Sequence, residues 1–88
     1  MPDVDAVWRR IEEHAGERFE QVRGATFTYR VGSGHVVPDR TPRQIPRSHF
    51  GRALDLVPLT GPGEIQALQG PSYIYAILMD ARIRQGDW

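Results

Sequence analysis

The first part of the chain carries the hydrophobic pattern of an amphipathic helix. Apolar residues recur at helical spacing from Val4 onward, and charged residues occupy the opposite face. Asp3 is a suitable N-cap residue, and Gly16 can adopt the left-handed conformation that ends a helix. The pattern therefore predicts a helix over residues 3–15, with Trp8 in the core.

After this helix the period of the apolar residues changes to two. Short strands are expected at residues 19–22 and at 26–31, where apolar and polar residues alternate as in a half-buried antiparallel strand. Glycines at positions 32 and 34 predict a tight turn into a partner strand at 35–37. With a further short strand at 43–45, the pattern predicts a meander of three or four strands.

Helical spacing returns in the second half of the chain. Pro46 suits the first turn of a helix that continues to residue 57. Residues 64–69 are expected to form one helical turn, and a last helix is expected from residue 70, with a frayed end at 80–84. The remaining tail, residues 85–88, is expected to be mobile.

Together these elements predict one α+β domain over residues 1–88. It has an N-terminal helix, a three- to four-stranded antiparallel meander, and then two helices packed on one sheet face. A chain of 88 residues supports one modest core and is too short for two. The residues expected in that core are Trp8, Ile11, Phe27, Tyr29, Ile45, Phe50, Leu54, Ile74, Ile77 and Leu78.

Composition removes several kinds of chemistry. The chain has no cysteine, hence no disulfide framework and no thiolate zinc site. All eleven basic residues are arginine, so no lysine is available as a Schiff-base nucleophile or as a phosphate-loop cation. His14, His35 and His49 lack the spacing of metal ligands, and Ser48 and His49 point apart as neighbours on a helix. We therefore expect no enzymatic activity, no metal and no cofactor.

The chain also lacks the signals of a membrane or secreted protein. No apolar run approaches the roughly 20 residues of a membrane span. The acidic N-terminus lacks the basic-then-apolar order of a signal peptide. We expect a cytoplasmic protein with no membrane partner.

Charge is distributed unevenly, although eleven acidic residues balance the eleven basic ones. Residues 23–52 carry six arginines and one aspartate, whereas the flanking segments 1–22 and 53–88 are acidic. Overall neutrality argues against a non-specific nucleic-acid binder but allows a compact basic face. Guanidinium groups suit phosphates, guanine edges and protein carboxylates. The candidate nucleic-acid or anion contacts are Arg30, Arg40, Arg43, Arg47 and Arg52.

Two segments carry a resemblance to known proteins. They are residues 45–50 (IPRSHF) followed by 53–56, and residues 61–66 (GPGEIQ) followed by 70–78 (GPSYIYAIL). Over about residues 17–84 the chain resembles a group of small uncharacterised proteins of high-GC bacteria, and similar segments are attached to restriction- or defence-type proteins. The resemblance implies a DNA-facing accessory module, brings no established activity with it, and assigns no residue a role.

The leading hypothesis is a non-enzymatic binding module that holds DNA through the arginine-rich strand-to-helix segment, residues 40–52. The alternative is a protein-interaction or homodimerisation domain that uses an uncovered sheet face or the tyrosine-bearing last helix. A third interpretation needs no ligand, because the arginines would only neutralise the acidic face of the first helix or solvate the surface.

Overall fold

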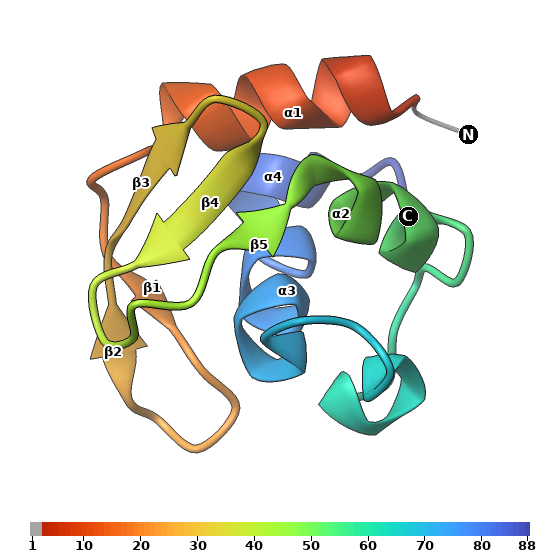
Figure 1. The fold of residues 1–88 in the computed structure, drawn as a ribbon. Coiled ribbons are helices and arrows are strands. Elements are labelled where there is room, and N and C mark those ends of the chain that lie inside the picture. The colour runs from red at the N-terminus through yellow and green to blue at the C-terminus, as the bar shows by residue number, and fades with distance from the viewer. Residues whose placement is uncertain (1–2) are drawn as a thin grey trace.

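The fold combines an N-terminal helix, short strands and a helical C-terminal half (Figure 1). It is taken from a computed structural model, which describes residues 3–88. The elements of these residues are, in chain order, α1 (Val4–Glu13), β1 (Phe19–Glu20), β2 (Thr26–Phe27), β3 (Tyr29–Gly32), β4 (His35–Pro38), β5 (Ile45–Pro46), α2 (Arg47–Leu54), the 3-10 helix η1 (Pro62–Ile65), α3 (Pro71–Leu78) and α4 (Ala81–Arg84).

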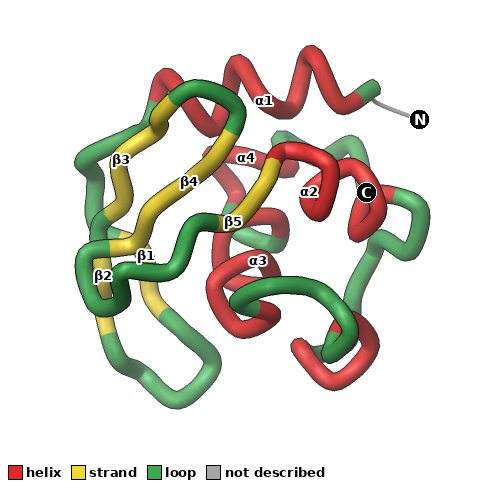
Figure 2. Tube along the Cα trace, viewed as in Figure 1, coloured by secondary structure: helices red, strands yellow, loops and turns green. Residues whose placement is uncertain are grey.

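The strands form two small antiparallel sheets (Figure 2). β1 pairs with β2, and the second sheet is the meander β3–β4–β5 with β4 in the middle. The predicted α+β class is therefore confirmed. The predicted strand 26–31 is interrupted at Thr28, because its first residues pair with β1 and its last residues with β4. Period-two alternation continues through this break, since Phe27 and Tyr29 both face the core.

Helix α1 follows its predicted stripe closely. Asp3 caps it, with the Ala6 amide donating to Asp3 Oδ1 at 2.8 Å, and the apolar face is buried. The helix ends at Glu13, two residues before the predicted end. Gly16 lies beyond it with φ +88°, and its amide donates to the Tyr29 carbonyl at 2.9 Å. The turn after α1 is thereby tied to β3.

The helical half begins one residue later than predicted. Pro46 is the last residue of β5 and caps α2 with extended backbone angles, so α2 begins at Arg47 and ends at Leu54 rather than at residue 57. The last predicted helix is divided in two. Asp80 starts α4 by accepting a hydrogen bond from the Arg82 amide at 2.9 Å, so residues 80–84 form a capped helix rather than a frayed end.

One core joins all of these elements. All ten residues predicted to be buried are buried, and Trp8 packs edge-on against Phe50 with ring centroids 5.8 Å apart. The prediction omitted Phe19 and Ile83, which are also fully buried. No helix within residues 3–88 combines the length and the apolar character needed to cross a bilayer.

Candidate functional site

Arg30 and Arg40 line the same surface groove. Alternation along β3 places Tyr29 in the core and Arg30 on the outer face, opposite Val37 of β4. The chain then leaves β4 and returns Arg40 to the same place, where Arg40 Nη1 lies 3.4 Å from the Thr26 carbonyl. We call this hollow the β3–β4 groove. It has a volume of about 590 Å³ and is lined by Gly16, residues 28–30 and residues 37–42.

The lining of the β3–β4 groove combines apolar and polar residues. Pro42 is exposed there, Val37 is only 7% exposed although it lies on the outer face of β4, and Pro38 is fully buried opposite Tyr29. The one acid in the lining is Asp39, whose Oδ1 accepts a hydrogen bond from the Thr28 amide at 3.0 Å. Two guanidinium groups thus face one carboxylate.

Arg30 and Arg40 have no ion-pair partner within residues 3–88, where the ion pairs involve other side chains. Both arginines are exposed. A guanidinium group that forms no ion pair keeps its donors available for an anion from outside the protein.

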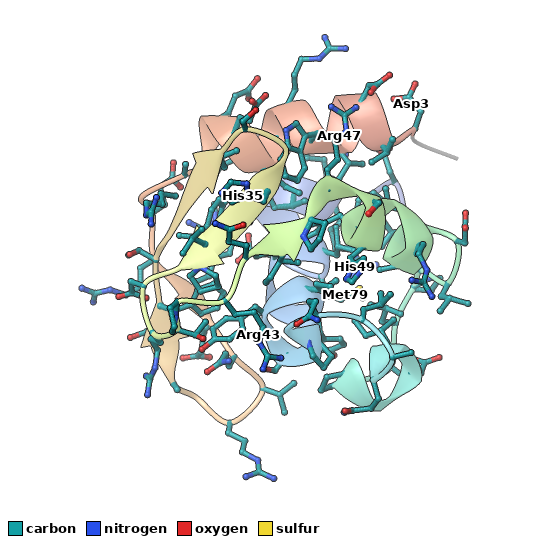
Figure 3. The ribbon with its side chains drawn as sticks, viewed as in Figure 1. Asp3, His35, Arg43, Arg47, His49 and Met79 are labelled. Carbon is teal, nitrogen blue, oxygen red and sulfur yellow. The ribbon has the colours of Figure 1, made fainter. Side chains whose placement is uncertain are left out.

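Arg47 is engaged inside the protein. Its Nη2 forms an ion pair with Asp5 of α1, and its guanidinium carbon lies 5.7 Å from the centre of the Trp8 ring. Figure 3 shows Arg47 reaching α1 from the start of α2. For this arginine the geometry matches the interpretation that needs no ligand, because it neutralises an acid of α1 and joins two helices.

Arg43 and Arg52 lie apart from the groove. Arg43 is exposed on the connection that enters β5, in front of α3 in Figure 3. Arg52 lines a smaller cleft of about 280 Å³ between α2 and η1, where Asp55 and Glu64 accompany it. The structure therefore brings together Arg30 and Arg40, and distributes the other three predicted contacts over separate places.

The histidines all have local partners. His14 Nδ1 lies 3.0 Å from Glu17 Oε2, and His35 Nδ1 lies 3.2 Å from the Ser33 carbonyl. His49 Nδ1 accepts a hydrogen bond from the Gln69 amide at 3.0 Å. Across residues 3–88, no three side chains of metal-binding type come together. Each histidine is accounted for by the local structure.

Arg82, which was not among the five candidate arginines, makes several contacts inside the protein. Arg82 donates to both carboxylate oxygens of Asp80 at 2.9 Å and to Glu17 Oε1 at 3.0 Å, and it lies 3.9 Å from the centre of the Phe19 ring. Hydrogen bonds from His14 and Arg82 lower the pKa of Glu17, and Arg82 also lowers the pKa of Asp80. This network connects α1, β1 and α4.

The position of the groove follows in part from the length of the turn between β3 and β4, which can be read from the sequence. The strand pattern alone does not indicate it. The two-residue turn after Gly32 sets the register of β3 against β4, which places Tyr29 opposite Pro38. Extending that register places Thr28 opposite Asp39, so Arg40 must follow at the same end of the hairpin. The closeness of Arg40 to β2 depends in addition on the break at Thr28, which the alternation conceals.

No protein-family model, curated protein or solved structure matches this chain.

Proposed function

We propose that this protein is a small non-enzymatic binding module whose ligand is DNA, held at the β3–β4 groove by Arg30 and Arg40, with Arg43 as an outlying contact. The observation that supports this proposal is that two exposed arginines without internal ion pairs line one groove of about 590 Å³. Guanidinium groups bind phosphates through two parallel hydrogen bonds, which suits a DNA backbone.

The proposed contact set is narrower than the five arginines of the sequence. Arg47 is omitted because its charge is balanced by Asp5 and its face is covered by Trp8. Arg52 is omitted because two acids share its cleft. With two or three phosphate contacts, we expect weak, salt-sensitive binding with a Kd on the order of 10⁻⁴ to 10⁻⁶ M.

Fluorescence anisotropy with a labelled DNA duplex over a series of salt concentrations tests the proposal. The groove variant is Arg30→Gln with Arg40→Gln, and the matched control is Arg9→Gln with Arg52→Gln, which removes the same charge from exposed positions elsewhere. We expect the groove variant to bind several-fold more weakly, with the slope of log K against log salt reduced by about two, because each phosphate contact contributes about −0.9.

The control variant is expected to bind like the wild type. Equal losses in both variants would contradict the proposal, since they would indicate that only total charge matters. Wild-type binding that does not weaken as salt rises would also contradict it.

A second candidate function is homodimerisation or docking of a protein partner. It is favoured by Leu56, which is 51% exposed beside Ile65 and Leu68 in the cleft between α2 and η1. Light scattering on the eluted protein tests it: a dimer that dissociates in Leu56→Ser supports this function. A monomer at every concentration, with no protein captured through Leu56, contradicts it.

A further inference from the structure

We infer that the β3–β4 groove accommodates one unpaired nucleotide, so that the DNA bound by this protein is single-stranded or carries an unpaired base. The inference rests on the proposed function, and it specifies the form of DNA that the same groove recognises.

The first argument for an unpaired nucleotide is the size of the groove. A volume of about 590 Å³ lies within the range of about 300–1,000 Å³ that is typical of small-ligand pockets. An intact duplex presents its phosphates on a convex surface and keeps its bases stacked inside. A base or a sugar that leaves the stack can enter a hollow of this size.

The second argument is the exposed apolar surface in the groove. Pro42 presents a surface that phosphate oxygens cannot use, because phosphates need donors and positive charge. The face of a nucleobase, in contrast, gains from covering apolar side chains. The arginines at the rim serve both parts of a nucleotide, since a guanidinium group pairs with phosphate and its plane stacks on a base.

The third argument is the presence of the Asp39 carboxylate in the lining of the groove. A carboxylate in a phosphate-binding groove opposes the ligand, so its presence is unfavourable if phosphate is all that binds. An exocyclic amino group of a base is a suitable donor for it, as in the contact of acidic residues with cytosine N4. The Thr28 amide occupies Asp39 Oδ1, which fixes the side chain and leaves Oδ2 for the base.

Two other hollows of residues 3–88 are lined by an arginine, and both differ in these respects. The hollow at Arg23, of about 480 Å³, has a single guanidinium group and no acid in its lining. The cleft at Arg52 is about half as large as the β3–β4 groove, at about 280 Å³, and contains Asp55 and Glu64. Two carboxylates against one guanidinium group make it unsuitable for a nucleotide.

Binding of the full chain to labelled oligonucleotides tests the inference. The probes are a single-stranded oligonucleotide of about 12 nucleotides, the same sequence as a duplex, oligo-dC and oligo-dT, all at low salt. We expect the single strand to bind about fivefold or more tightly than the duplex, and oligo-dC to bind more tightly than oligo-dT.

Asp39→Asn provides the second arm. Asparagine Oδ1 can still accept from the Thr28 amide, but an amide NH₂ donor then replaces the free carboxylate oxygen. We expect this variant to keep its melting temperature, to lose the preference for oligo-dC, and to bind oligo-dT no more weakly than the wild type does. Titration with oligo-dC should also shift the amide NMR signals of Thr28, Val37 and Thr41.

The outcomes separate the inference from the proposed function. Duplex binding that equals or exceeds single-strand binding overturns the inference and leaves the proposed function intact. Binding of neither form overturns both. A preference for oligo-dC that survives Asp39→Asn overturns the role assigned to Asp39, and unchanged amide signals at Thr28, Val37 and Thr41 overturn the location.

Discussion

Thr28 and Asp39 are joined by two hydrogen bonds at the open end of the β3–β4 hairpin. The Asp39 amide donates to the Thr28 carbonyl at 2.9 Å, and the Thr28 amide donates to Asp39 Oδ1 at 3.0 Å. A side-chain oxygen therefore replaces a backbone carbonyl in the ladder, where β2 ends and the groove begins. The pair fixes the position of the connection that carries Arg40.

Asp39→Ala removes the acceptor of the Thr28 amide. We expect the free energy of unfolding to fall by about 0.5–1.5 kcal/mol, because the bond lies at the surface, where water can replace the lost partner. Urea unfolding measures the change. Asp39→Asn, which keeps an acceptor oxygen, is the control and should lie close to the wild type. An equal loss in both variants would assign the effect to charge rather than to the hydrogen bond.

Tyr29 is buried, and its hydroxyl donates to the Ile11 carbonyl at 2.6 Å. That carbonyl belongs to the last turn of α1, whose carbonyls have no partner within the helix. Tyr29→Phe leaves it unsatisfied, so we expect a loss of about 1–2 kcal/mol in the free energy of unfolding. Matched urea titrations of the two proteins at neutral pH measure it, and a variant as stable as the wild type would show that water reaches this carbonyl.

The same phenol should make stability depend on alkaline pH. Burial, as the largest cause, raises the pKa of Tyr29 far above its ordinary value of 10.0. The folded state therefore favours the neutral phenol, and its contribution to stability is complete below about pH 10 and decreases as the pH rises further. We expect wild-type stability to decline more steeply than that of Tyr29→Phe above pH 10. Parallel slopes would contradict the burial argument.

The parts of the fold that follow from local patterns could be predicted from the sequence. Helix α1 is specified by its apolar stripe and its Asp3 cap, both contained within one segment. The break at Thr28 could not be predicted, because it depends on which distant strand pairs with each half of an unbroken alternation. The division between α3 and α4 was hidden in the same way, since the apolar stripe continues past Asp80 while its side chain starts a new helix.

The site was predictable only in part, for a related reason. A basic segment can be recognised from composition. Whether each arginine forms an internal ion pair or lines the groove, however, depends on contacts between distant positions. Arg47 is paired with Asp5 across two helices, and nothing near Arg47 in the sequence indicates this. Arg30 and Arg40 share a groove because of hairpin register, which is a property of the turn between them.

Arg47 should contribute to the packing of α1 on α2 and little to DNA binding. A double-mutant cycle of Arg47→Met and Asp5→Asn should give a coupling of about 0.3–1 kcal/mol, because the Asp5 side chain is 70% exposed and water screens the pair. Anisotropy should find DNA binding by Arg47→Met close to that of the wild type. If Arg47→Met lost as much DNA affinity as the groove variant does, Arg47 would have to be counted among the DNA contacts.

Arg82 should be the arginine with the largest effect on stability. Its fork binds both oxygens of Asp80 and also reaches Glu17, an arrangement that lysine cannot reproduce. We expect Arg82→Gln to lower the free energy of unfolding by about 1–2 kcal/mol, a value reduced for the exposed third of the side chain. Arg82→Lys should recover less than half of this loss. Arg18→Gln, at an exposed position, is the control and should have little effect.

The Arg82 network also predicts a response to acid. The pKa of Asp80 is lowered by its hydrogen bonds from Arg82, so the stability it provides is complete above the ordinary pKa of 3.8 and is lost as the pH falls further. Between pH 5 and pH 2, about the range in which carboxylates titrate, we expect wild-type stability to fall more steeply than that of Arg82→Gln. If the stability of the two proteins fell equally between pH 5 and pH 2, the carboxylates bound by Arg82 would not be the cause of the acid sensitivity.

Trp88 provides the last prediction, because it bears on the mobility expected of residues 85–88. Its indole Nε1 donates to the carbonyl of Leu78, the final residue of α3, at 2.9 Å, and its ring packs partly buried against the core. Trp88→Ala removes both contacts and should lower the free energy of unfolding by about 1–2 kcal/mol. Trp88→Phe keeps most of the ring contact without the donor and should lose about half as much. Hydrogen exchange of the amides in α4 should accelerate in Trp88→Ala. A tail without the Trp88 anchor should hold less firmly the bond of Arg84 in α4 to the carbonyl of residue 88 and the ion pair of Asp87 with Arg10. If the tail is instead mobile in solution, both variants will match the wild type in stability and in exchange.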